Sequence, residues 1–230
     1  MTIGGVVQHE DSYRAGATAA IPVAVAVGAF GVSFGVLALN AGFGPVLAVL
    51  MSLTTFGGSA QFAAAAVFAQ GGSVTTAVLA AAFLNARYLP IGASVASALS
   101  PRNLLRLVQA QLVVDESWAI ANRSGHVLGR RLIGAGLAIY LSWVGGTVIG
   151  VVGGGLLHDP TRLGLDGAFP ALFLALLVSQ LRTRRAMAAA LLGGLIALVL
   201  VPLAPPGVPI IAAVGACLVG LGGGRARQAR

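Results

Sequence analysis

The chain has 230 residues, of which 57% are hydrophobic and only 9% are charged. Soluble domains carry about 25% charged residues, so this composition predicts an all-α, polytopic helical membrane protein. The formal net charge is +8, and arginine supplies all of the positive charge because lysine is absent. The arginines lie in short loops and the C-terminal tail, where they set topology and contact anionic headgroups, so nucleic-acid binding is not expected.

Apolar stretches long enough to cross a bilayer, ~20 residues each, recur along the chain. They lie at 16–39, 45–70, 74–99, 132–157, 165–181, 187–204 and 208–223. About seven spans are therefore expected, within a range of six to eight. The first stretch continues past signal-peptide length and is expected to be retained. We expect an N-terminal tail at 1–15, a single transmembrane domain at 16–223 and a basic cytoplasmic tail at 224–230.

Arginine clusters give an orientation, since excess arginine near span ends marks the cytoplasm. Clusters lie at 102–106, 123–131, 182–185 and 225–230. The spans from 132 onward then alternate, and the C-terminus is cytoplasmic. The N-terminal side stays open, because three full crossings before Arg102 place it outside and one re-entrant segment places it inside. The piece 104–122 starts and ends beside these arginines, so a surface helix, a hairpin dipping into the bilayer or a misnumbered span would each fit.

The span at 45–70 contains the polar stretch "TTFGGSAQF" at 54–62. The pair Gly57 and Gly58 costs about 1 kcal/mol per residue relative to alanine in a helix and permits a break. Broken helices are tolerated in a bilayer only beside protein or a water-filled cavity, and transporters use them to coordinate substrates. Ser59 and Gln61 would line the same place, although close helix packing explains small residues equally well.

The stretch "FLNARYLP" at 83–90 places Asn85 and Arg87 near the middle of the span 74–99. An arginine at the centre of a membrane helix costs at least ~2.5–3.5 kcal/mol on insertion scales, which favours a paired or functional side chain over snorkelling. Such an arginine suits a substrate carboxylate held bidentately. It suits a structural ion pair equally well.

The stretch "QAQLVVDESWAIANR" at 109–123 holds Asp115 and Glu116. In a continuous helix, Gln111 and Asp115 would share one face and Glu116 would point about 100° away. One carboxylate could then meet Arg87 while the other carries a proton. An amphipathic helix at the membrane surface with solvated acids is the competing interpretation.

The remaining residues give no sign of an enzyme or of a cofactor. The three histidines are scattered through loops, and the single cysteine, Cys217, has no partner, so no metal site is expected. Hydrolase and phosphate-binding motifs are absent from the sequence.

The segments "FGVSFGVLALNAG", "MSLTTFGGSAQF", "FLNARYLPIGASV" and "VVDESWAI" occur in this order. Together they resemble the AzlC-type family, the large subunit of bacterial branched-chain amino acid exporters. The resemblance is specific from about residue 16 to about 125 and rests mainly on span number from 132 to 223.

The resemblance implies a permease of the bacterial inner membrane that exports branched-chain or other hydrophobic amino acids. It also implies a small AzlD-type membrane subunit and no nucleotide-binding domain. On this basis Gly57, Gly58, Ser59, Gln61, Asn85 and Arg87 are expected to bind the substrate, and Asp115 or Glu116 to couple transport to protons. The alternative is a structural or assembly subunit whose partner carries the transport site.

Overall fold

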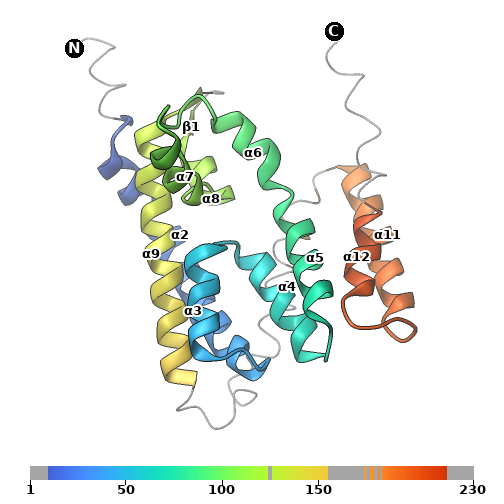
Figure 1. The fold of residues 1–230 in the computed structure, drawn as a ribbon. Coiled ribbons are helices and arrows are strands. Elements are labelled where there is room, and N and C mark those ends of the chain that lie inside the picture. The colour runs from blue at the N-terminus through green and yellow to red at the C-terminus, as the bar shows by residue number, and fades with distance from the viewer. Residues whose placement is uncertain are drawn as a thin grey trace, which may run out of the picture. The chain divides into compact units, whose positions relative to one another are not determined.

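A computed structural model describes residues 10–123, 126–154 and 183–216, together with residues 174, 177, 178 and 181. The described chain is helical apart from one short antiparallel hairpin, as Figure 1 shows. The elements are α2 (Tyr13–Asn40), α3 (Pro45–Thr54), α4 (Gly58–Ala69), α5 (Val74–Asn85), α6 (Tyr88–Val95), α7 (Asn103–Gln111), α8 (Asp115–Ala121), β1 (Asn122–Arg123), β2 (His126–Val127), α9 (Gly129–Gly154), α11 (Arg184–Leu200) and α12 (Val208–Val214).

The described residues form two compact units. One comprises the described residues up to Gln61 and those from Asn85 through α9. The other comprises Phe62–Leu84 and the described residues from 174 onward. The prediction of a single transmembrane domain at 16–223 stays a prediction.

Among the described residues, α2 and α9 are long and apolar enough to cross a membrane. A third crossing results if α5 and α6, which meet at an angle of 44°, form one bent span. The expected span at 165–181 lies almost entirely outside the described residues. The structure therefore agrees with a helical membrane protein, while the count of seven spans stays a prediction.

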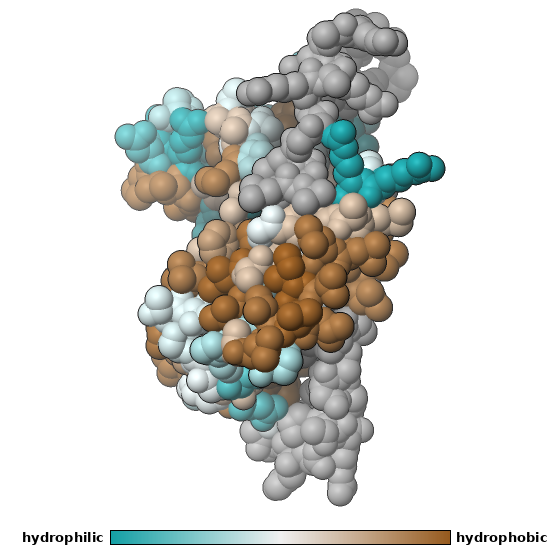
Figure 2. Space-filling model, turned by 90° about the vertical axis from the view of Figure 1, so that its right-hand side faces the viewer, coloured by the Kyte–Doolittle hydropathy of each residue, from teal (hydrophilic) through white to brown (hydrophobic). Residues whose placement is uncertain are grey.

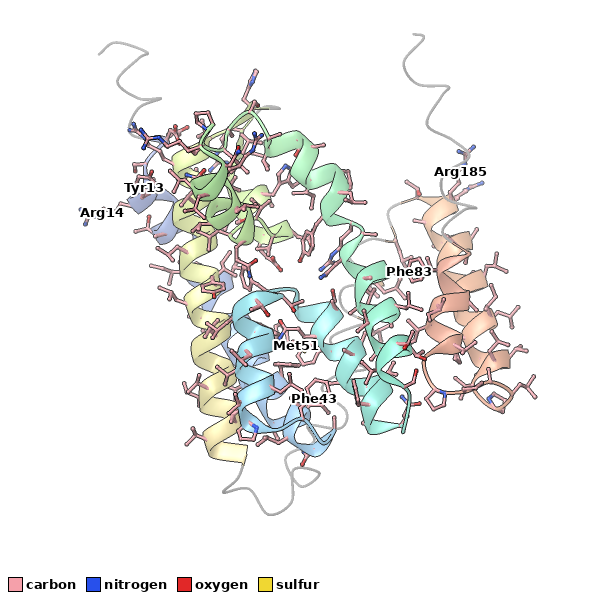
Figure 3. All side chains as sticks on the ribbon, viewed as in Figure 1. Tyr13, Arg14, Phe43, Met51, Phe83 and Arg185 are labelled. Atoms are coloured by element: carbon pink, nitrogen blue, oxygen red, sulfur yellow. The ribbon has the colours of Figure 1, made fainter. Side chains whose placement is uncertain are left out.

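The packing of α2 against α9 organises the first unit. Gly16 lies against the backbone of Arg131 near the start of α9, and Gly35 lies against that of Val151 near its end, so the two helices run parallel. Small residues allow this close approach of two membrane helices. Figure 3 shows the direction of α2, with Arg14 near its start at one end of the unit and Phe43, which follows α2, toward the other end.

A short N-terminal segment fixes the start of α9. The carboxylate Oδ1 of Asp11 accepts hydrogen bonds from the backbone N–H groups of Arg130, at 2.9 Å, and Arg131, at 3.1 Å. These N–H groups lack partners within the helix, so the carboxylate caps it. The Arg131 side chain is only 9% exposed, and its Nε donates to the carbonyl of Ile120. For Arg131, the expectation of a side chain touching headgroups is therefore wrong, because its guanidinium ties α9 to the end of α8.

In the second unit, α11 and α12 form a hairpin. Gly193 of α11 packs against Ala213 and Ala216, and the turn between the helices contains Gly207 with a φ of 90°. Figure 2 shows hydrophobic side chains gathered on the face that α11 presents. Leu191 and Leu198 of α11 are 76% and 73% exposed, as expected of a helix facing lipid.

Candidate functional site

Three of the breaks between helices in the described residues of the first unit are at most three residues long. They fall between α3 and α4, between α5 and α6, and between α7 and α8. The first confirms the break expected within 45–70, since α3 ends at Thr54 and α4 begins at Gly58. The third shows that the continuous helix considered for 109–123 is wrong, because α7 ends at Gln111 and α8 begins at Asp115.

Direct contacts bring these breaks together. The Nε2 of Gln111 donates to the carbonyl oxygens of Leu53, at 3.1 Å, and Thr54, at 2.9 Å. Those carbonyls belong to the last turn of α3, where a helix lacks internal donors. The hydroxyl of Tyr140 also donates to the Leu53 carbonyl, at 2.9 Å. Since Tyr140 lies near the middle of α9, the breaks meet about halfway along the longest helices of this unit.

Arg87 occupies the meeting point. Its Nη2 lies 3.0 Å from Asp115 Oδ2 and donates to Ser59 Oγ, also at 3.0 Å. It further donates to the Tyr88 hydroxyl at 3.4 Å, and the guanidinium carbon lies 5.2 Å from the centre of that ring. One guanidinium thus connects side chains from all three breaks. The predicted pairing of Arg87 with an acidic side chain is present, and Asp115 is the partner.

The Arg87 guanidinium has N–H groups that make no hydrogen bond with the described residues. The Arg87 and Asp115 side chains are 42% and 37% exposed. The Nε and Nη1 groups of Arg87 make no hydrogen bond with the described residues, although arginine carries five N–H donors. A carboxylate arriving from solvent could therefore bind Arg87 without first displacing Asp115.

Asn85 contributes a buried acceptor beside the first break. Its Oδ1 is buried and has no hydrogen-bond partner among the described residues. A Cβ atom on Gly57 would lie 2.7 Å from that oxygen, so only glycine leaves this approach open. Buried polar atoms are almost always hydrogen-bonded, and an orphan acceptor indicates a donor supplied by water or a ligand.

Gln61 holds the first break in place. Its side chain is 0% exposed, and its Oε1 accepts from the Gly57 N–H at 3.3 Å and from Trp143 Nε1 at 3.0 Å. Its Nε2 donates to Ser52 Oγ at 2.9 Å, and Ser52 in turn shares a hydrogen bond with Thr147. A role for Gln61 in substrate binding stays a prediction, while these contacts connect both sides of the break to α9.

Replacing Gln61 with leucine is expected to lower the free energy of unfolding by about 2–5 kcal/mol, because two buried N–H groups and a hydroxyl each lose a partner. Thermal unfolding of the detergent-solubilised protein measures the effect. Gln70→Leu is the matched control, since Gln70 is exposed and its side chain, within the described part of the chain, bonds only to the carbonyl of Ala66 one turn earlier. Equal stability of the two variants would contradict a structural role for the Gln61 network.

The break also stores backbone strain. Phe56 has a φ of 37°, a left-handed conformation that is unfavourable for a bulky residue. Its side chain is 5% exposed and meets the Tyr140 ring edge-on at 5.0 Å between centroids. Such strain persists only where the surroundings enforce it, and it concentrates at functional sites.

The structure separates the two neighbouring acids. Asp115 binds Arg87, whereas Glu116 is half-buried and makes no ion pair with the described residues. Ser117, which follows them, is fully buried, and its hydroxyl bonds to the backbone of Val114 and Leu112. The start of α8 is therefore held rigidly while the two carboxylates keep different surroundings.

Several residues of the site were not expected from the sequence. They are Ser52, Tyr140, Trp143 and Thr147, together with Gln111 in its role as donor to α3. Each lies far from its partner in the sequence, so no local pattern could pair them. The one available signal was the presence of polar and indole side chains within apolar stretches.

Comparison with known proteins identifies a family for the part of the chain that contains these breaks. Residues 22–157 match the family described as AzlC protein, and this range includes all three breaks, the whole of α9 and α2 from Pro22 onward. No solved structure matches the chain significantly.

Of three relatives, two are named as membrane proteins and the third as a transport protein. An uncharacterized membrane protein of Archaeoglobus fulgidus is 35% identical over 203 residues, covering 87% of this chain and 90% of that protein. Inner membrane protein YgaZ of Escherichia coli is 28% identical, covering 80% of each chain. The branched-chain amino acid transport protein AzlC of Bacillus subtilis is 27% identical, covering 74% of this chain and 68% of that protein.

The match and the relatives support a role in membrane transport, and a transport family suggests that the protein is not an enzyme. The resemblance read from the sequence motifs is thereby confirmed. The chain belongs to the AzlC family.

Proposed function

We propose that this chain is the large subunit of a secondary transporter that exports branched-chain or other hydrophobic amino acids across the bacterial inner membrane. It works with a small AzlD-type membrane subunit. The observation that carries the proposal is Arg87, a partly exposed guanidinium with unused N–H groups where three helix breaks meet. Family membership and the name of the Bacillus subtilis relative support the transport of amino acids.

The site can hold both charged groups of an amino acid. The free N–H groups of Arg87 bind the substrate carboxylate, and the orphan Oδ1 of Asn85 accepts from the ammonium group. Gly57 leaves the approach to the Asn85 oxygen open, whereas Gly58 packs against the Trp143 ring. The Ser59 hydroxyl accepts a hydrogen bond from the guanidinium. This assignment gives Gln61 a positioning role, since its polar atoms already hold Gly57, Ser52 and Trp143.

The parallel packing of α2 and α9 supports a specific topology. Both helices start on the same side of the membrane. The chain between the end of α2 and the start of α9 must therefore cross the membrane an odd number of times. The bent pair α5–α6 supplies one return. The helices α3, α4, α7 and α8 have 7 to 12 residues each, and at about 1.5 Å per residue none crosses alone.

We therefore assign 45–70 as a re-entrant segment and α7–α8 as a hairpin that does not cross. Arginines at the start of α9 then place both helix starts in the cytoplasm. Together with the crossings that the sequence predicts at 165–181, 187–204 and 208–223, this assignment gives six crossings and a cytoplasmic C-terminus. This arrangement lies within the expected range of six to eight.

The proposed coupling of transport to protons rests on the Arg87 guanidinium, which contacts Asp115 and would also bind the substrate. A substrate carboxylate bound at Arg87 would share the positive charge that attracts Asp115, so Asp115 is the first candidate for carrying the proton. Glu116, which has no cationic partner among the described residues, is the second candidate for carrying the proton.

Asp115→Asn or Glu116→Gln is expected to uncouple export from the proton gradient, because an amide cannot carry the proton. Leucine export driven by an imposed pH difference should fall at least about tenfold, while leucine–leucine exchange without a gradient persists. Flux into and out of proteoliposomes at matched and unmatched pH measures both. Gradient dependence that survives in both variants would exclude these carboxylates as the coupling site.

The function itself is tested by efflux from cells preloaded with labelled leucine, valine and methionine. Cells carry this chain alone, the chain with its small neighbour, or neither. Faster efflux with the chain supports a transporter. If reconstituted liposomes export only when the small subunit is present, and substrate binds the small subunit alone, the chain is an assembly subunit instead.

A further inference from the structure

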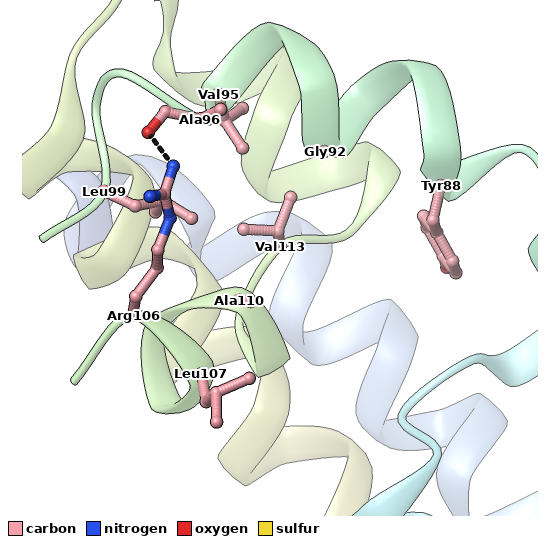
Figure 4. Close-up of a pocket in the computed structure, with 9 residues that line it drawn as sticks. All are labelled: Tyr88, Gly92, Val95, Ala96, Leu99, Arg106, Leu107, Ala110 and Val113. Carbon is pink, nitrogen blue, oxygen red and sulfur yellow. Dashed lines mark hydrogen bonds between the residues drawn. The ribbon is translucent and has the colours of Figure 1, made fainter. Parts of the chain in front are cut away.

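A cavity of about 390 Å³ lies between α6 and α7. Its walls are mostly aliphatic side chains and small residues, among them Val95, Leu107 and Val113. Figure 4 shows Tyr88 at one end of the cavity and Arg106 toward the other, with Gly92 between them. The Arg106 guanidinium there donates to the carbonyl of Ala96 at 2.6 Å.

Tyr88 connects this cavity to the site at Arg87. The Tyr88 side chain lines the cavity. It also contacts the Arg87 guanidinium through both its hydroxyl and its ring. A molecule held by its carboxylate at Arg87 would therefore have its side chain beside Tyr88, at the mouth of an apolar space.

Gly92 is a position on the cavity wall where a larger side chain would have room. It lines the cavity, and a Cβ added to it would meet no atom within 4 Å. A larger residue at this position would therefore extend into open volume without displacing the α6 backbone. The arrangement resembles a side-chain pocket whose depth is set by one residue on its wall.

We propose that the cavity between α6 and α7 is the subsite for the aliphatic side chain of an amino acid held at Arg87, and that Gly92 sets the side-chain length it accepts. The inference rests on the proposed transport function. The guanidinium of Arg106 at the far end gives a second selection rule, because it repels cationic side chains and disfavours lysine-like and arginine-like substrates.

The test uses a graded series at position 92, Gly92→Ala, Gly92→Val and Gly92→Leu. Binding of labelled leucine to the purified protein is competed with alanine, valine, leucine, methionine and lysine. The ratio of leucine to alanine affinity is expected to fall progressively, by about 10- to 100-fold in Gly92→Leu. Alanine binding should stay within about threefold of the wild type, since its side chain does not reach position 92.

Gly145→Leu is the matched control. Gly145 lies in α9, is exposed, and would also meet no atom within 4 Å on gaining a Cβ. The control should keep the wild-type selectivity, and thermal unfolding of each variant separates lost folding from lost binding. Because Gly92→Ala adds only one carbon, it reports on selectivity even if Gly92→Leu fails to fold.

The outcomes separate this proposal from the transport function. An unchanged ratio of leucine to alanine affinity across the series overturns the subsite, and so does tight lysine binding. A lipid chain filling the cavity would give that same unchanged ratio. If the wild type binds leucine but exports nothing, and the Gly92 variants change the ratio of leucine to alanine affinity, the subsite is upheld and the exporter is overturned. Wild-type protein that binds none of these amino acids overturns both.

Discussion

Replacing Arg87 with alanine is expected to lower leucine export at least about 100-fold while folded protein persists, because the substrate carboxylate loses its charged donor. Arg87→Lys should recover only part of the activity. A single ammonium group cannot bind a carboxylate bidentately and donate to Ser59 at the same time. Efflux of labelled leucine, corrected for the amount of protein in the membrane, measures the change.

Arg102→Ala is the matched control for this prediction. Arg102 is exposed at the start of α7, and its side chain makes no hydrogen bond or ion pair with the described residues. The double variant Arg87→Ala with Asp115→Asn tests whether the loss comes only from leaving Asp115 unpaired. If the double variant regains export, or if Arg87→Ala removes the protein from the membrane and the double variant restores it, Arg87 is a structural residue.

Valine at position 146 is expected to abolish the fold, whereas valine at the adjacent position 145 should be tolerated. A Cβ on Gly146 would collide with the backbone of Gly28 and lie 3.0 Å from the backbone nitrogen of Val32. Only backbone atoms stand in the way, so α2 and α9 would have to separate. We expect a loss of at least about 3 kcal/mol in the free energy of unfolding.

Gly145→Val adds the same atoms one residue earlier on the same helix, with nothing within 4 Å of the new Cβ. The yield of monodisperse protein after detergent extraction, and its unfolding temperature, compare the two variants. Equal behaviour of the pair would contradict the parallel packing of α2 and α9. It would also remove the argument that both helices start on the same side of the membrane.

The sequence predicted the parts of the site that depend on local chemistry. Two adjacent glycines within a polar stretch indicated the break after α3, and the arginine within an apolar span indicated the pairing that the structure shows with Asp115. Both signals are strong because glycine pairs and charges are costly inside membrane helices.

Other parts could not be read from the sequence because they depend on contacts between distant segments. The sequence allowed a hairpin at 104–122 but did not show that the helix stops at Gln111, whose side chain donates to the carbonyls of α3. Glycines on both helices allow α9 to approach α2 closely, but the spacing of Gly146 and Gly150 does not identify the partner helix or its direction.

Equilibrium binding of labelled leucine to the purified chain in nanodiscs, competed with leucine and with leucinamide, tests the central claim most directly. Leucinamide keeps the side chain and the amino group but lacks the carboxylate that Arg87 is proposed to bind. We expect leucine to compete at least about 100-fold better than leucinamide on the wild type, and the two to compete equally on Arg87→Ala. Equal competition on the wild type, or an undiminished preference for leucine on Arg87→Ala, would contradict the assignment of Arg87 as the carboxylate site.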